Sequence, residues 1–259
     1  MDQKRRMIVL AEGRFSPLRS KTANGAIVYL REQVLAIIDS TKAGQTAQQV
    51  LGYGGDIPVV KSLEEGLKFK PNALLIGIAP SGGRLPDAWR EMIKTAIRNK
   101  LDILNGLHTI LSDDPEFAAL AKEHHCTITD WRKIPLTSEV VSQGNWRTRH
   151  AKAILTVGTD CNIGKMTTML EVHKEFLNRG LKSDFIGTGQ TGMMISRKGI
   201  SVDAIIGDYI AGSIEKEIDE SEREKFDYIF VEGQGSLTHQ GYSGVTLGLI
   251  HGTMPDAML

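Results

Sequence analysis

One stretch, AKAILTVGTDCNIGKMTT at residues 151–168, constrains this chain more than any other. A short apolar run leads into Gly158, a loop follows that ends on Gly164 and Lys165, and helix-forming sequence begins at once. This order is typical of a phosphate-binding loop (P-loop), in which backbone N–H groups, a helix N-terminus and one lysine hold an anion. We therefore predict that this stretch binds a phosphate group. The predicted binding residues are Gly158, Thr159, Asp160, Cys161, Asn162, Ile163, Gly164, Lys165, Met166, Thr167 and Thr168.

The loop departs from the usual GxxxxGK(S/T) pattern at two positions. Thr159 stands where the first glycine is expected, and Met166 follows the lysine where a serine or threonine is expected. In nucleotide hydrolases that hydroxyl binds the magnesium ion that bridges the β- and γ-phosphates, and a methionine cannot replace it. Thr167 lies about 100° further around the helix, so its equivalence does not follow from the sequence. The pattern favours a loop whose bound phosphates survive the reaction.

Magnesium-dependent chemistry stays open as an alternative. In that case we expect Asp160, Thr167 and Glu232 to hold Mg²⁺, because Asp160 and Glu232 both follow buried strands near the loop. Hydrogen bonds from backbone N–H groups to the two carboxylates are the competing interpretation.

Apolar runs alternate with helical sequence along the whole chain, which predicts an α/β protein built from parallel βα units. Residues 1–135 are expected to form a Rossmann-like, doubly wound parallel sheet. Residues 136–150 collect Pro, Ser, Gln, Gly and Asn and are predicted to be a linker. Residues 151–259 are expected to form a P-loop NTPase-like α/β domain, with a helix at 202–218. The dense charges of residues 215–225 predict a solvated surface.

Composition limits the class of partner. The chain of 259 residues has 31 basic and 31 acidic residues, so its formal net charge is zero and no nucleic-acid-binding surface is indicated. No apolar run approaches the roughly 20 residues of a membrane span. The two cysteines show no pairing pattern. We expect a cytoplasmic homo-oligomer that acts on a small molecule and binds neither nucleic acid nor membrane.

Several segments resemble known proteins. GTDCNIGKMTT and VEGQGSLTH (231–239) are similar to motifs of dethiobiotin synthetase. From end to end, the chain more closely resembles a two-domain bacterial and archaeal family described as D-glutamate N-acetyltransferase-like and formerly labelled an NAD-dependent epimerase. Members of that family extend further, so the resemblance implies that a C-terminal part of the second domain is missing here. The matching segments are KTANG (21–25), the glycine loop after Ala79, NGLHTIL (105–111), the P-loop, TGQTG (188–192) and VEGQGSLTHQGYSGVTLGLIHG (231–252).

The resemblance implies acetyl transfer from acetyl-CoA to the amino group of D-glutamate or a similar amino acid. Coenzyme A carries a pyrophosphate and a 3′-phosphate, so it suits a P-loop that does not cleave its ligand. Acyl transfer needs a base for the ammonium group and donors for the thioester oxyanion. His239 is the first candidate base and His251 the second, with Glu232 also assigned to the catalytic set. Ser243 and Tyr242 are candidate donors.

Each of these residues has a structural alternative. Either histidine can be a structural residue of a glycine-rich loop, and Cys161 can be a small loop residue rather than an acyl-accepting thiol. Lys21, Arg84, Gln190 and Tyr242 are the candidates for binding the substrate, although basic side chains are most often simply solvated.

Other features favour structural interpretations. His173 lies on the apolar face of a predicted helix and is expected to be packed, and residues 124–126 (HHC) are not expected to form a metal site. The first strand is followed by AEGRFSPLRS, which lacks the GxGxxG pattern of a dinucleotide-binding domain.

Two other functions stay open from the sequence. One is a ligase or kinase of the dethiobiotin synthetase type, which would activate a carboxylate with ATP and Mg²⁺. The other is a non-catalytic sensor of a nucleotide or of coenzyme A.

Overall fold

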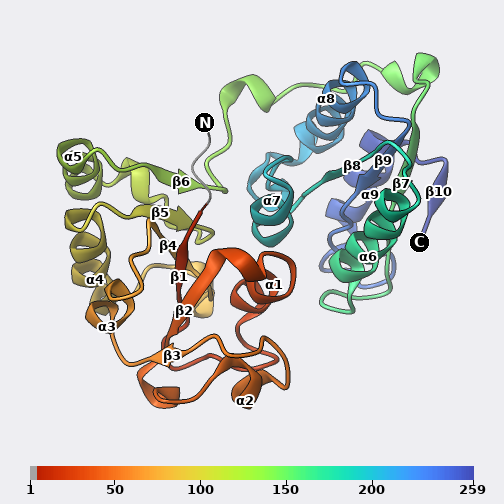
Figure 1. The fold of residues 1–259 in the computed structure, drawn as a ribbon. Coiled ribbons are helices and arrows are strands. Elements are labelled where there is room, and N and C mark those ends of the chain that lie inside the picture. The colour runs from red at the N-terminus through yellow and green to blue at the C-terminus, as the bar shows by residue number, and fades with distance from the viewer. Residues whose placement is uncertain (1–4) are drawn as a thin grey trace. The chain divides into compact units, whose positions relative to one another are not determined.

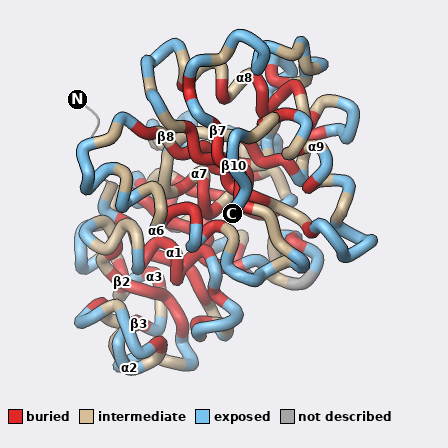
Figure 2. Tube along the Cα trace, turned by 90° about the vertical axis from the view of Figure 1, so that its right-hand side faces the viewer, coloured by how far each residue is buried: buried red, intermediate tan, exposed pale blue. Residues whose placement is uncertain are grey.

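The computed structural model describes residues 5–259, and the chain divides into two compact units, Met1–Trp131 and Arg132–Leu259 (Figure 1). In each unit the buried residues run along the strands of a parallel sheet (Figure 2). No helix of the described residues combines the length and apolar composition needed to cross a membrane.

The first unit is a doubly wound parallel sheet with the strand order β3-β2-β1-β4-β5-β6. This order is that of the Rossmann fold, which confirms the prediction. The central strand β1 is completely buried because helices cover both faces of such a sheet. The strands are β1 (Met7–Leu10), β2 (Val34–Ile38), β3 (Val59–Val60), β4 (Ala73–Ile76), β5 (Asp102–Asn105) and β6 (Ile128–Asp130). The helices are α1 (Lys21–Tyr29), α2 (Ala47–Leu51), α3 (Leu63–Leu67), α4 (Asp87–Arg98) and α5 (Pro115–His124).

The second unit is a four-stranded parallel sheet with the order β10-β7-β9-β8. The strand that precedes the P-loop, β7, therefore lies beside β9, which carries the VEG motif. The strands are β7 (Lys152–Leu155), β8 (Ser183–Ile186), β9 (Tyr228–Val231) and β10 (Ala257–Met258). The helices are α6 (Lys165–Asn178), α7 (Gln190–Ser196), α8 (Ile210–Arg223) and α9 (Ser243–Thr253).

One predicted helix has different bounds. Residues 202–209 form two short 3-10 turns separated by extended backbone at Ile205 and Ile206, and α8 begins only at Ile210 and continues to Arg223. The prediction of a helix from residue 202 was wrong because the apolar residues there face the core from non-helical backbone.

The acidic face of α8 binds backbone rather than only solvent. The buried Glu215 carboxylate accepts hydrogen bonds from the N–H groups of Gln143 (2.5 Å) and Asn145 (2.7 Å). Glu222 accepts from the N–H groups of His150 and Ala151. Residues 138–151, most of which were predicted to be a linker, are thus packed along α8 within the second unit. The prediction of a solvated surface was wrong for Glu215.

His173 is packed, as predicted. Its ring lies against Phe185 and Phe230, with centroid distances of 6.0 and 5.4 Å, and its Nε2 is 3.2 Å from the carbonyl oxygen of Ser183. Burial lowers the pKa of His173, which favours the neutral ring.

Candidate functional site

The P-loop leaves the carboxyl end of β7 and turns back into α6. A β-carbon built on Gly158 would lie 2.6 Å from Ile163 Cδ1 and 3.3 Å from Lys165 Cδ, so a larger residue here would displace the exposed Ile163 side chain where the loop folds over itself. Asn162 and Gly164 adopt left-handed backbone conformations, with φ of +59° and +106°. These two residues reverse the chain, because asparagine and glycine tolerate this region best.

The loop presents backbone donors together with a lysine. Within residues 5–259, the N–H groups of Asn162, Ile163 and Gly164 donate no hydrogen bond to the protein. They lie at the N-terminus of the 14-residue helix α6, where the helix dipole favours an anion. Lys165 Nζ lies over the loop and donates to the carbonyl oxygen of Asp160 at 2.7 Å. The arrangement can hold a phosphate group through several N–H groups and one ammonium.

The side chain after the lysine faces the core. Met166 is only 9% exposed and shares its face of α6 with the buried Met169 and Leu170, whereas Thr167 and Thr168 are exposed. Spacing of three and four residues brings these three apolar side chains onto one face of the helix. Methionine at this position therefore serves packing and places no oxygen near the loop.

A segment after β9 holds the P-loop from the other side. Ser236 is fully buried, and its Oγ donates to the carbonyl oxygen of Thr159 at 2.8 Å. The same Oγ accepts the N–H of His239 at 2.7 Å. Thr238 Oγ1 also donates to the carbonyl oxygen of Thr159 at 2.8 Å. The N–H of Leu237 donates to the carbonyl oxygen of Gly158. Ser236 thus connects the loop to the first candidate base.

Three of the candidate catalytic residues lie in one turn. The exposed His239 ring is 4.7 Å from the Tyr242 ring, and Ser243, the first residue of α9, follows directly. His239 Nδ1 accepts the N–H of Gly241 at 3.1 Å, which places the proton of the neutral ring on Nε2. In this arrangement Nε2 is a donor, and the ring can accept a proton only after the Gly241 contact opens. His251 is in the last turn of α9, roughly 12 Å further along that helix.

Glu232 is buried at the end of β9 and holds the TGQTG loop. Its Oε2 accepts the N–H groups of Thr188 at 2.8 Å and Gly189 at 3.1 Å. A β-carbon on Gly192 would lie 2.0 Å from the same oxygen, so the glycine is required by the close approach of the carboxylate. This geometry supports the interpretation of Glu232 as a cap for backbone N–H groups.

Few of the described side chains can serve as metal donors together. Across the part of the chain that the structure describes, no group of three or more His, Cys, Asp or Glu side chains could hold a metal ion, residues 124–126 included. Magnesium held through nucleotide phosphates needs only one or two protein ligands. Asp160 and Thr167 are both exposed and stay predictions for that role, whereas the Glu232 carboxylate is buried against backbone N–H groups.

The substrate candidates are distributed over both units. Gln190 is the first residue of α7, and its Oε1 accepts a hydrogen bond from Arg132 at 3.0 Å. Arg132 also forms an ion pair with Asp203 at 2.7 Å. The two residues are far apart in the sequence, and no motif predicted this contact. Lys21 begins α1 and Arg84 follows a short turn after β4, both exposed in the first unit.

The first unit does not present the ribose-binding acid of dinucleotide-binding Rossmann domains. That acid follows β2, where this chain has Asp39. Asp39 is fully buried, and its carboxylate accepts the N–H of Phe15 at 2.9 Å and both the N–H and the hydroxyl of Thr41. Together with the missing GxGxxG pattern, this argues against a dinucleotide site.

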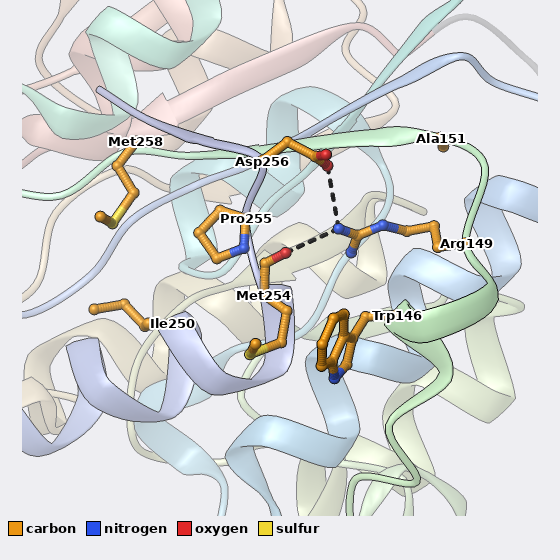
Figure 3. A pocket seen from close by; sticks show the side chains of 8 residues that line it. All are labelled: Trp146, Arg149, Ala151, Ile250, Met254, Pro255, Asp256 and Met258. Atoms are coloured by element: carbon orange, nitrogen blue, oxygen red, sulfur yellow. Dashed lines mark hydrogen bonds and ion pairs between the residues drawn. The ribbon is translucent and has the colours of Figure 1, made fainter.

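The second unit contains a pocket of about 530 Å³, and none of the residues that line it belongs to the predicted site. Figure 3 shows these lining residues. The pocket is bordered by Arg149 and Ala151, which precede β7, whereas the P-loop follows that strand. Arg149 donates to the carbonyl oxygens of Thr253 (2.7 Å) and Met254 (2.9 Å) and pairs with Asp256 at 3.3 Å. The arginine therefore caps the C-terminus of α9, which is a structural role.

Comparisons with known proteins identify both units. Residues 40–134 match the family model described as a domain of unknown function (DUF1611_N), Rossmann-like domain, and residues 140–259 match DUF1611_C, P-loop domain. A crystal structure of a DUF1611 family protein from Anabaena variabilis superposes with a TM-score of 0.91 at 38% identity, covering 98% of this chain and 73% of that one. The chain belongs to the DUF1611 family. The family resemblance and the fold class inferred from the motifs are thereby confirmed.

Two curated relatives of this DUF1611 chain carry a functional name. A protein from Tritonibacter scottomollicae named D-glutamate N-acetyltransferase is 40% identical over 209 residues, which are 80% of this chain and 61% of that protein. One of the same name from a Pseudoalteromonas species is 38% identical over 198 residues, which are 76% and 58% of the two chains. The chain thus spans about three fifths of the length of these relatives.

Proposed function

We propose that this protein is an N-acetyltransferase that binds the phosphates of acetyl-CoA at residues 158–168 and acetylates D-glutamate or a similar amino acid. The observation that carries the proposal is the P-loop itself. It combines unbonded N–H groups and Lys165 with a methionine packed into the core at the position of the usual magnesium ligand. Such a loop suits phosphates that are held and not transferred. The names of the two relatives supply the reaction and the substrate class.

The chemistry assigns roles to the turn after Ser236. The amino nitrogen of the substrate attacks the thioester carbonyl carbon, the C–S bond breaks, and the coenzyme A thiolate leaves. The developing oxyanion needs donors, and the Nε2–H of His239 and the hydroxyl of Tyr242 lie in one turn. The Ser243 hydroxyl donates to the carbonyl oxygen of Gln240 at 3.5 Å and must leave it to serve as a third donor. The substrate ammonium must first lose a proton, and His239 can accept it only at Nδ1, after the Gly241 contact opens.

Binding and turnover are tested separately. Calorimetry should detect acetyl-CoA binding by the wild-type protein, strong weakening in Lys165→Ala, and no change in Lys174→Ala, an exposed lysine further along α6. Release of the coenzyme A thiol should then require D-glutamate. Folded protein that binds acetyl-CoA but releases no thiol across a panel of D- and L-amino acids would overturn the transferase and leave a coenzyme A sensor.

An ATP- and Mg²⁺-dependent ligase or kinase is the second candidate. The hydroxyl of Thr167 in the first turn of α6 and the carboxylate of Asp160 favour it, since both side chains are exposed beside the loop. The Asp160 carboxylate also accepts the N–H of Cys161 at 2.6 Å. This function predicts that ATP raises the melting temperature only when magnesium is present. Equal responses to ATP with and without magnesium would contradict it.

A further inference from the structure

The carboxyl edge of the first unit's sheet carries cations that the proposed function leaves unused. We propose that this edge is a binding site for a small dicarboxylate, formed by Lys21 and Arg84 with the neighbouring Arg14, Arg19 and His108. The choice of glutamate as the probe rests on the proposed function, whereas the site itself does not depend on the P-loop chemistry.

The topology brings the relevant loops together. β1 and β4 are neighbours, and the chain leaves them toward opposite sides of the sheet, toward β2 and β5. Ligands of open α/β sheets bind outside the carboxyl ends of the strands at this switch point. Lys21 opens the helix after β1, and Arg84 lies in the loop after β4, so both belong to this edge.

Hydrogen bonds and close packing hold the three loops to one another. Ala23 in the first turn of α1 donates to the carbonyl oxygen of Gly77 at 2.8 Å, and a β-carbon on Gly77 would lie 2.9 Å from that of Ala23. His108, in the loop after β5, donates its N–H to the Gly83 carbonyl at 2.8 Å. A β-carbon on Gly83 would lie 2.2 Å from the His108 ring. The histidine ring therefore packs against Gly83, the residue that precedes Arg84.

Within the part of the chain that the structure describes, no acidic side chain pairs with the cations at this edge. Among residues 5–259, the side chains of Arg14, Arg19, Lys21 and Arg84 form no ion pair and no hydrogen bond. The acids at the same edge are engaged elsewhere, since Asp39 binds Phe15 and Thr41, and the Glu12 carboxylate accepts from the N–H and hydroxyl of Ser40. Arginine and lysine side chains without acidic partners favour a carboxylate ligand.

The long loop that carries Arg14 and Arg19 is fixed from inside. Asn24 is buried, and its Nδ2 donates to the carbonyl oxygens of Ser16 and Pro17, both at 3.0 Å. Ser20 Oγ donates to Ser16 and Asn24 and gives no side-chain cap to α1, which also lacks an acid in its first turn. The positive end of the helix dipole therefore adds to the cations. Because the Asp39 carboxylate is already hydrogen-bonded to Phe15 and Thr41, it cannot bind a ribose, and the edge suits a small anion and not a dinucleotide.

The test is calorimetry on the full chain with D-glutamate, glutarate and inorganic phosphate, without acetyl-CoA. Lys21→Gln and Arg84→Gln should each weaken binding of both dicarboxylates roughly tenfold, the usual effect of losing a charged hydrogen bond. The matched controls Arg98→Gln and Lys122→Gln lie at the opposite, amino edge of the sheet and should bind like the wild type. Melting temperatures verify that each variant is folded.

The outcomes separate this site from the proposed function. Dicarboxylate binding that is lost in Lys21→Gln and Arg84→Gln but kept in Lys165→Ala supports the site even if no acetyl transfer is found. Absence of dicarboxylate binding, unchanged affinity in the Lys21→Gln/Arg84→Gln double variant, or equally tight binding of phosphate by Lys165→Ala, in which the P-loop lysine is removed, overturns it. Acetyl transfer by a double variant that still binds D-glutamate with wild-type affinity in calorimetry overturns the site and leaves the transferase standing.

Discussion

Removing the Ser236 hydroxyl should weaken both the fold and the P-loop. Ser236 Oγ makes three hydrogen bonds in a fully buried position, donating to the Thr159 carbonyl (2.8 Å) and accepting the N–H groups of His239 (2.7 Å) and Thr238 (3.1 Å). Ser236→Ala deletes all three, although Thr238 Oγ1 still donates to the Thr159 carbonyl. Each net bond contributes about 1 kcal/mol, so we expect a loss of about 2–3 kcal/mol.

The measurements are thermal unfolding and calorimetric titration with acetyl-CoA. A loss of this size corresponds to a decrease in melting temperature of roughly 4–12 °C for a chain of this length. Ligand affinity should also decrease, because Thr159 and the loop are no longer held in the binding conformation. The control is Thr238→Ala, an exposed residue that loses one bond to the same carbonyl. If Ser236→Ala is as stable as Thr238→Ala and binds acetyl-CoA like the wild type, the Ser236 hydroxyl does not hold the P-loop in its binding conformation.

Three further predictions concern substitutions at His239, Gly192 and Glu217. If His239 acts as an Nε2–H donor, His239→Gln should keep part of the acetyl-transfer rate that His239→Ala loses, whereas equal losses would indicate a base. Gly192→Ala should destabilise by about 2–3 kcal/mol, since the new methyl meets the buried Glu232 oxygen, while Gly207→Ala, where the space is open, should be near neutral in thermal unfolding. Burial, with Glu220 nearby, raises the pKa of Glu217 from the ordinary 4.5, so its ionisation destabilises the fold as pH rises. Glu217→Gln should therefore raise the melting temperature at pH 7.5 but not at pH 4.5, and a gain that is the same at both would contradict this.

The sequence predicted the features that depend on neighbouring residues. The P-loop, the alternation of strands and helices, the two-domain organisation and the packed His173 all follow from local order and period, because a strand, a turn and an amphipathic helix are encoded within about ten residues. The burial of Met166 also has a local signal, since its spacing to Met169 and Leu170 places the three side chains on one face of α6.

The tertiary structure decided which distant groups meet. Ser236 donates to the carbonyl oxygen of Thr159, 77 positions away, and Glu215 accepts the N–H of Gln143, 72 positions away. No pattern of neighbouring residues predicts either hydrogen bond. For the same reason the sequence does not show that Asp39, at the position of the ribose-binding acid in dinucleotide-binding domains, accepts the N–H of Phe15. A carboxylate or hydroxyl near a site can make only a few hydrogen bonds but has many possible partners, and only the folded chain determines which partners it takes. The phosphate loop could therefore be predicted from its own residues. The roles of the residues around it could not, because their positions depend on the order of the strands in the sheet.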